Sequence, residues 1–221
     1  MLRSFRLPRT ARQRHAAWLP MAALLAMGCA PQRGAADPPP AAVSAPVRAP
    51  VAAATGDAEL SRFVPAEATL RMSARGDLDG DGDEDALIAV ESDGAGASNA
   101  PRALYLLRRG ADGALELAVR SPQAILCRSC GGMMGDPLQG MRAGRGEFTL
   151  RFEGGSRELW SSEYRFEYVP GRDAWQLAGI VFDGFDRADG SSAQRSSVPA
   201  DFGDVPLADF DPENFPADAL P

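Results

Sequence analysis

The chain has 221 residues, of which 45% are hydrophobic and 7% aromatic, enough for one domain with a sizeable core. All 23 basic residues are arginine, and 30 acidic residues bring the formal charge at pH 7 to −7. The single histidine, His15, lies close to the amino terminus. The rest of the chain therefore has no histidine for a Ser-His-Asp triad, a Cys-His pair or a histidine zinc site.

The first 28 residues have the composition of an export signal. Five arginines precede an apolar run over residues 16–27, and Pro20 and the short length argue against a membrane-spanning helix. The run ends in Ala26-Met27-Gly28-Cys29, which resembles a lipobox, the site where bacterial lipoproteins are cleaved and acylated on cysteine. We therefore expect a lipoprotein signal peptide at 1–28 and lipidation of Cys29. Simple secretion or a soluble periplasmic protein is the alternative.

The resemblance to lipoproteins also implies a location. Ala30 follows the cysteine, instead of the aspartate linked with inner-membrane retention, which implies a lipid anchor at the periplasmic face of the outer membrane. Removing the leader leaves 18 arginines against 30 acidic residues, a formal charge of −12. Because an acidic chain is repelled by nucleic acid, we expect no nucleic-acid partner. The lipoprotein resemblance implies contact with the membrane through the anchor, and an envelope-protein or cell-wall partner.

The remaining chain divides into a linker, a β domain and a tail. Residues 29–58 are rich in alanine and proline, cannot bury a core and are expected to form a disordered linker. The β domain is predicted over 59–183, and its strands are indicated by apolar and polar residues in alternation or by short apolar runs. The predicted strands cover residues 69–74, 86–90, 103–107, 115–119, 147–153, 163–168 and 175–182. Residues 184–221 are expected to be an extended tail that lies on the domain through Phe202, Phe210 and Phe215.

The strand pattern determines the expected fold class. Asp112-Gly113 is typical of a hairpin turn, and strands with one polar and one apolar face indicate an antiparallel sheet. We expect an all-β domain of about seven or eight strands, either sandwich-like or a curled meander. The aromatic stripe Tyr164, Phe166 and Tyr168 is interpreted as core, in preference to a sugar-binding platform.

The stretch Asp77-Leu-Asp79-Gly-Asp81-Gly-Asp83-Glu-Asp85 has the spacing of an EF-hand-like metal loop. Asp77, Asp79, Asp81 and Asp85 supply side-chain oxygens in this interpretation, and Asp83 supplies its backbone carbonyl. Gly82 permits the sharp turn. Ile88 stands where the bidentate glutamate of an EF-hand belongs, so we expect a weak calcium site. The alternative is an acidic loop without a metal.

Two resemblances follow from these residues. The pattern Gly-Asp-Leu-Asp-Gly-Asp-Gly-Asp-Glu-Asp before a strand resembles the calcium loops of FG-GAP and VCBS repeats. Only one copy is present, which argues against a β-propeller. Together with a cysteine pair before Gly-Gly and a following Gly-Asp-Pro, the chain resembles a family of small bacterial envelope lipoproteins, and this resemblance implies no activity.

Cys127 and Cys130 form a CxxC pair with three competing interpretations: a structural disulfide, a redox centre and half of a zinc site. The oxidising compartment of an exported protein favours the disulfide. Residues 131–137 are poor helix formers, which argues against the helix start that redox cysteines use.

We therefore expect a calcium-binding envelope lipoprotein that acts as an interaction module and is not an enzyme. The alternatives are a periplasmic thiol–disulfide oxidoreductase with Cys127 as nucleophile, and a purely structural cell-wall protein.

Overall fold

The computed structural model describes residues 58–93 and 100–215. The predicted signal peptide, Cys29 and nearly all of the predicted linker lie outside the described residues. Within the described ranges, the structure contains no helix with the length and apolar character needed to cross a membrane.

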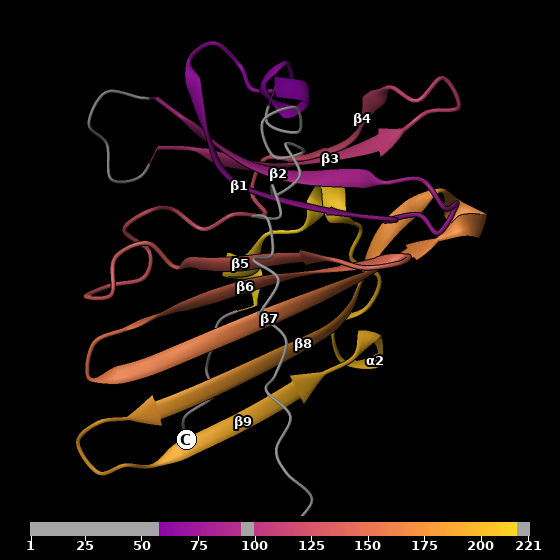
Figure 1. Ribbon diagram of the computed structural model, residues 1–221. Coiled ribbons are helices and arrows are strands. Elements are labelled where there is room, and N and C mark those ends of the chain that lie inside the picture. The colour runs from indigo at the N-terminus through magenta and orange to yellow at the C-terminus, as the bar shows by residue number, and fades with distance from the viewer. Residues whose placement is uncertain (1–57, 94–99, 216–221) are drawn as a thin grey trace, which may run out of the picture. The chain divides into compact units, whose positions relative to one another are not determined.

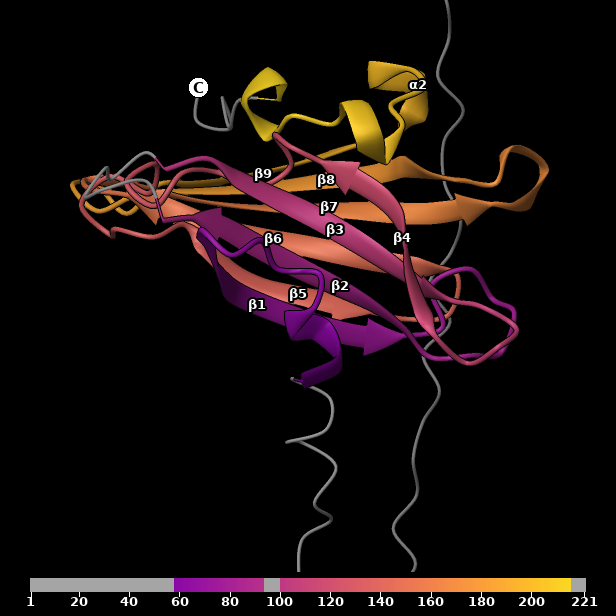
Figure 2. The same cartoon turned by 90° about the horizontal axis from the view of Figure 1, so that it is seen from above.

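Nine antiparallel strands form two sheets, which confirms the all-β prediction (Figure 1). The first sheet has the order β1-β2-β3-β4 and the second the order β5-β6-β7-β8-β9. Seen from above, the first sheet lies over the second, as in a sandwich (Figure 2). The strands of the first sheet are β1 (Ala68–Gly76), β2 (Asp85–Ser92), β3 (Arg102–Arg109) and β4 (Leu115–Ser121). Those of the second are β5 (Leu138–Ala143), β6 (Glu147–Gly155), β7 (Glu158–Val169), β8 (Ala174–Asp186) and β9 (Ser192–Ser197).

The main hydrophobic core lies between the two sheets. Leu87 and Leu106 point into it from the first sheet, and Phe148 and Phe166 from the second, with ring centroids 4.8 Å apart. The alternation that predicted the strands therefore places one face of each sheet inside. The prediction that the aromatic stripe is core is confirmed for Tyr164 and Phe166, which are buried, whereas Tyr168 is half-buried at the edge of the core.

Strand β2 is buried on both faces, which explains its unbroken apolar sequence. Leu87 faces the second sheet, whereas Ile88 faces a smaller cluster on the opposite side. Leu60, from the segment that precedes β1, covers this outer cluster and is 1% exposed. Ile88 therefore packs in the outer cluster, on the opposite face of β2 from Leu87, because successive side chains of a strand point to opposite faces.

The carboxyl-terminal part of the chain differs from the predicted extended tail. The sheet continues past residue 183, because β8 ends at Asp186 and β9 pairs with it. Helix α2 (Pro199–Phe202) and the 3-10 turns η2 (Leu207–Asp209) and η3 (Pro212–Asn214) follow, and Phe210 is fully buried in the main core. The expected contact of the tail aromatics with the domain is confirmed, but the segment closes the sandwich as an integral part of it. A third 3-10 turn, η1 (Pro170–Arg172), connects β7 to β8.

Candidate metal centre

The acidic loop connects the first two strands of the first sheet. Asp77 directly follows β1, and Asp85 is the first residue of β2. Gly80 and Gly82 have φ angles of 80° and 104°, a region that glycine adopts without steric cost. These two glycines let the chain reverse within the loop, as predicted for Gly82; the role of Gly80 was not predicted.

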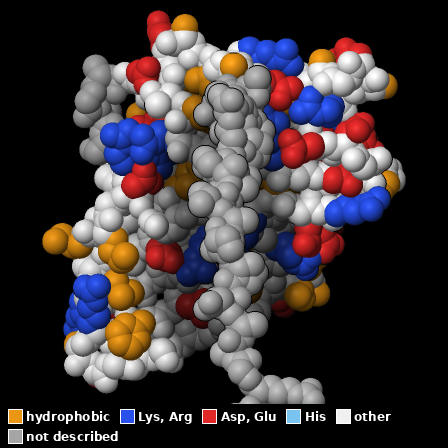
Figure 3. Space-filling model, viewed as in Figure 1, with side chains coloured by type: hydrophobic (Ala, Val, Ile, Leu, Met, Phe, Trp, Pro, Cys, Tyr) orange, Lys and Arg blue, Asp and Glu red, His pale blue; other side chains and the backbone are white. Residues whose placement is uncertain are grey.

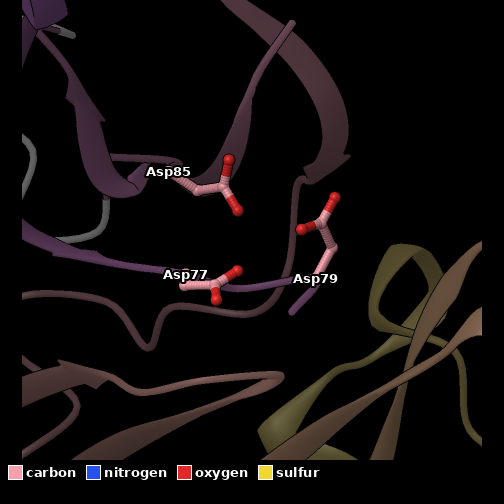
Figure 4. Close-up of side chains that lie close together, drawn as sticks. All are labelled: Asp77, Asp79 and Asp85. Carbon is pink, nitrogen blue, oxygen red and sulfur yellow. The ribbon is translucent and has the colours of Figure 1, made fainter. Parts of the chain in front are cut away.

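Three carboxylates of the loop converge. Asp77, Asp79 and Asp85 each offer one oxygen, and these oxygens all lie within 4.8 Å of one another (Figure 4). Asp85 is fully buried and Asp79 is 8% exposed. Asp81 and Asp83 have exposed side chains on the outer part of the loop, where the Asp81 carboxylate accepts a hydrogen bond from the Asp83 N–H at 2.9 Å. The structure thus brings together three of the five predicted residues through their side chains.

Asp85 fixes the geometry of the cluster. Its Oδ2 accepts a hydrogen bond from the Leu78 N–H at 2.9 Å, and its Oδ1 accepts one from the Arg109 N–H at 2.8 Å. Burial raises the pKa of Asp85 and outweighs these two hydrogen bonds, which act in the opposite direction. A bound cation would favour the ionised form of this carboxylate.

One other oxygen of the cluster has unused acceptor capacity. Asp77 Oδ1 is buried and accepts no hydrogen bond from the described residues. Asp79 Oδ2 forms an ion pair with the Arg108 guanidinium, and Asp77 Oδ2 lies 3.4 Å from Arg145 Nε. Buried carboxylate oxygens without hydrogen bonds are costly unless a cation compensates them. This all-oxygen donor set suits a hard divalent cation such as calcium.

The second sheet also holds the loop. Trp175 at the start of β8 donates its indole N–H to the Leu78 carbonyl at 2.8 Å, and both groups are buried. The Gly146 N–H, from the turn between β5 and β6, donates to the Asp77 carbonyl at 2.7 Å. The candidate metal centre is therefore a joint between the two sheets, built from one loop of the first sheet and from one turn and the start of one strand of the second.

The cysteine pair lies elsewhere, in the connection between β4 and β5. Cys127 and Cys130 form a disulfide, as the favoured interpretation predicted. Hydrogen-bonded turns follow the pair: the Gly131 N–H donates to the Gly135 carbonyl at 3.1 Å, and no helix begins anywhere in the described connection between these strands.

A buried ion cluster was not predicted from the sequence. Arg102, whose side chain is 1% exposed, donates from Nε to Glu91 at 2.7 Å and from Nη1 and Nη2 to the two oxygens of Asp136 at 2.7 and 2.6 Å. Arg71 and Arg128 also pair with Glu91. The one available signal was the placement of Glu91 and Arg102 at the ends of two apolar runs, where the strands pair them directly.

Comparisons with protein-family models, with curated proteins and with solved structures find no match to this chain.

Proposed function

We propose that this chain is a calcium-binding envelope lipoprotein that acts as a binding or interaction module. The observation that carries the proposal is the convergence of Asp77, Asp79 and Asp85, in which the buried Asp77 Oδ1 accepts no hydrogen bond from any described residue. Since the loop contacts both sheets, the bound ion would be structural and would stabilise the joint between them.

The donor chemistry favours calcium over other common metals. Zinc prefers nitrogen and sulfur ligands, and magnesium demands near-ideal octahedral geometry, whereas calcium accepts irregular oxygen sites. Ile88 is fully buried within β2 and has no side-chain oxygen, so the site lacks the bidentate glutamate of an EF-hand. We expect a Kd on the order of 10⁻⁴ M, as in extracellular calcium modules.

The direct test is a calcium titration of the purified protein against a chromophoric chelator. Binding of one calcium ion at submillimolar concentration, lost in the Asp79→Ala variant, supports the proposal. Absence of binding at several millimolar calcium would leave an acidic loop without a metal.

The anchor is a separate element of the proposal. Ala26-Met27-Gly28-Cys29 supports acylation of Cys29 and a location at the periplasmic face of the outer membrane. Mass spectrometry of the membrane fraction tests it, with diacylglyceryl-modified Cys29 as the expected amino terminus. An unmodified soluble protein would support secretion instead.

The surface is compatible with a protein or cell-wall partner. On the face in view in Figure 3, arginine and acidic side chains are interspersed, and the described residues there form no basic patch of the kind that binds nucleic acid. A purely structural cell-wall role would use the same surface.

The oxidoreductase alternative depends on the disulfide, whose two cysteines are only half-buried. An insulin-reduction assay tests it, because a reduction potential in the range of cellular oxidoreductases would favour catalysis over a structural bond.

A further inference from the structure

Arg108, near the end of β3, connects the acidic loop to the opposite sheet. Its Nε forms an ion pair with Asp79 Oδ2, and its Nη1 lies 2.9 Å from Asp173 Oδ1. The Asp79 side chain is 1% exposed, whereas that of Asp173 is 70% exposed. One guanidinium therefore bridges a buried carboxylate of the candidate metal centre and an exposed carboxylate in the turn between β7 and β8.

We propose that Arg108 is an internal competitor of the metal ion, which lowers the affinity of the site and moves from Asp79 to Asp173 when the ion binds. This inference rests on the proposed calcium site. It makes Arg108 the residue that sets the calcium concentration at which the loop fills.

Competition follows from the shared carboxylate. Arg108 pairs with Asp79 Oδ2, and one oxygen of the same carboxylate lies within 4.8 Å of oxygens of Asp77 and Asp85 (Figure 4). A divalent ion bound to this carboxylate and a guanidinium paired with it would repel each other at short range in a partly desolvated site. The ion therefore has to displace Arg108 from Asp79, and the lost ion pair is subtracted from the binding free energy.

Arg108 has space and a partner to move to. It lines an open groove of about 490 Å³ together with Asp81 and Asp173. The Tyr168 hydroxyl donates to Asp173 at 2.5 Å, and this bond, followed by the charge of Arg108, lowers the pKa of Asp173. The Tyr168 ring also lies 5.8 Å from the guanidinium carbon, within the range of a cation–π contact. Both groups can hold Arg108 after it leaves Asp79.

The exchange is tested by calcium titration of the full protein and of three single variants. Arg108→Gln removes the competitor, so calcium should bind on the order of tenfold more tightly than to the wild type. Arg151→Gln is the control: it removes the same charge from a surface pair with Glu153 within β6, so the Kd should change less than about twofold. Asp173→Asn keeps a residue that tolerates the φ of 48° and removes the second partner of Arg108. It should weaken calcium binding.

The double variant, with Arg108→Gln and Asp173→Asn, distinguishes a movement of Arg108 from Asp79 to Asp173 from a general effect of charge on the Kd. If Asp173 acts by receiving Arg108, Asp173→Asn should no longer change the Kd in the Arg108→Gln background. Unchanged or weaker calcium binding by Arg108→Gln, with a wild type that binds, would overturn the competition and leave the calcium site intact. If neither the wild type nor any variant binds calcium, the proposed function and this inference fail together. Far-UV circular dichroism and thermal unfolding of each variant exclude misfolding as the cause.

Discussion

The hairpin of β2 and β3 has a cluster of charged side chains at each end, and each cluster is here called a joint because it attaches the first sheet to other segments. The negative charges of the two joints are balanced in different ways. At one end, Glu91 of β2 pairs with Arg102 of β3, and the same arginine binds Asp136 from the disulfide-containing connection. At the other end, Asp85 opens β2 beside two further carboxylates. Both joints attach the first sheet to segments that belong to the second half of the chain.

The difference lies in where the cation comes from. Arg102 is a buried cation supplied by the protein. Burial alone would raise the pKa of Asp136, but the hydrogen bonds from Arg102 and from the Leu138 N–H, together with the charges of Arg102 and Arg71, outweigh burial and lower this pKa. In the acidic loop, burial prevails and raises the pKa of Asp85. The comparison shows that one joint is complete with its own side chains, whereas the other has carboxylates in excess of nearby arginines. We propose that calcium supplies the missing charge there.

The largest expected effect is the loss of Arg102. Arg102→Met should destabilise the protein by about 3–5 kcal/mol, because it leaves the buried Glu91 and the half-buried Asp136 without their main partner. Urea unfolding followed by circular dichroism measures the change. As a control, Arg151→Ala removes a surface pair with Glu153 and should cost less than about 1 kcal/mol. Equal effects of the two variants would show that the buried cluster is not the stronger joint.

Loss of the disulfide, which lies in the same connection as Asp136, should have an intermediate effect. Replacing Cys127 and Cys130 together by alanine should cost about 2 kcal/mol, because the bond closes a very short loop and restricts the unfolded chain little. Comparing this variant with the wild type, each with and without a dithiol reductant, measures the contribution. The wild type with reductant should match the variant. A larger loss would indicate that the disulfide also holds the ion cluster in place.

Calcium bound to the acidic loop should raise the free energy of unfolding by a smaller amount than these two changes lower it. At about 1 mM calcium and a Kd of about 10⁻⁴ M, binding adds about 1.4 kcal/mol to the free energy of unfolding. The melting temperature should rise by about 3–6 °C relative to chelator, and by less with magnesium. Asp79→Ala should abolish the rise and leave the sheets folded. An identical melting temperature of the wild type in calcium and in chelator would contradict the proposed difference between the two joints.

The smallest expected effect concerns the way in which the free energy of unfolding falls at low pH. The lowered pKa of Asp136 means that its contribution is present above the unfolded-state value near 3.8 and is lost as the pH falls through the lower folded-state value. Asp136→Asn should therefore lower stability at pH 7 and flatten its decline below about pH 4. Urea unfolding at a series of pH values measures both. A parallel decline in the variant and the wild type would show that Asp136 does not contribute to it.

The sequence was sufficient to predict the strands that face the core but not those that lack a strong pattern. Seven strands could be predicted because each has large apolar residues at alternate positions or in an unbroken run. Strand β5 was missed because the register shifts between Leu138 and Gly140, which disrupts its alternation. Strand β9 was missed because this edge strand consists mainly of small polar residues and contributes no large apolar side chain.

The part of the candidate site that lies within one continuous stretch of sequence could be predicted. The spacing of aspartates and glycines indicated the loop, and Asp77, Asp79 and Asp85 do converge. The partners from distant segments, Arg108 and Trp175, could not be predicted, because no local pattern indicates which residues the packing of two sheets will bring to a loop. The same holds for Asp136, which reaches Arg102 only through the fold.

The hydrogen bond from the Trp175 indole to the Leu78 carbonyl gives the protein an optical reporter of its own. The chain has 3 tryptophans, one of them in the predicted leader, so the remaining emission comes from Trp160 and Trp175. Trp175 is 2% exposed and its ring lies 4.8 Å from that of Tyr168, the residue that contacts both Arg108 and Asp173. We expect a rearrangement that moves Leu78 or Tyr168 to change the surroundings of this buried fluorophore, so that intrinsic fluorescence can follow it without a label.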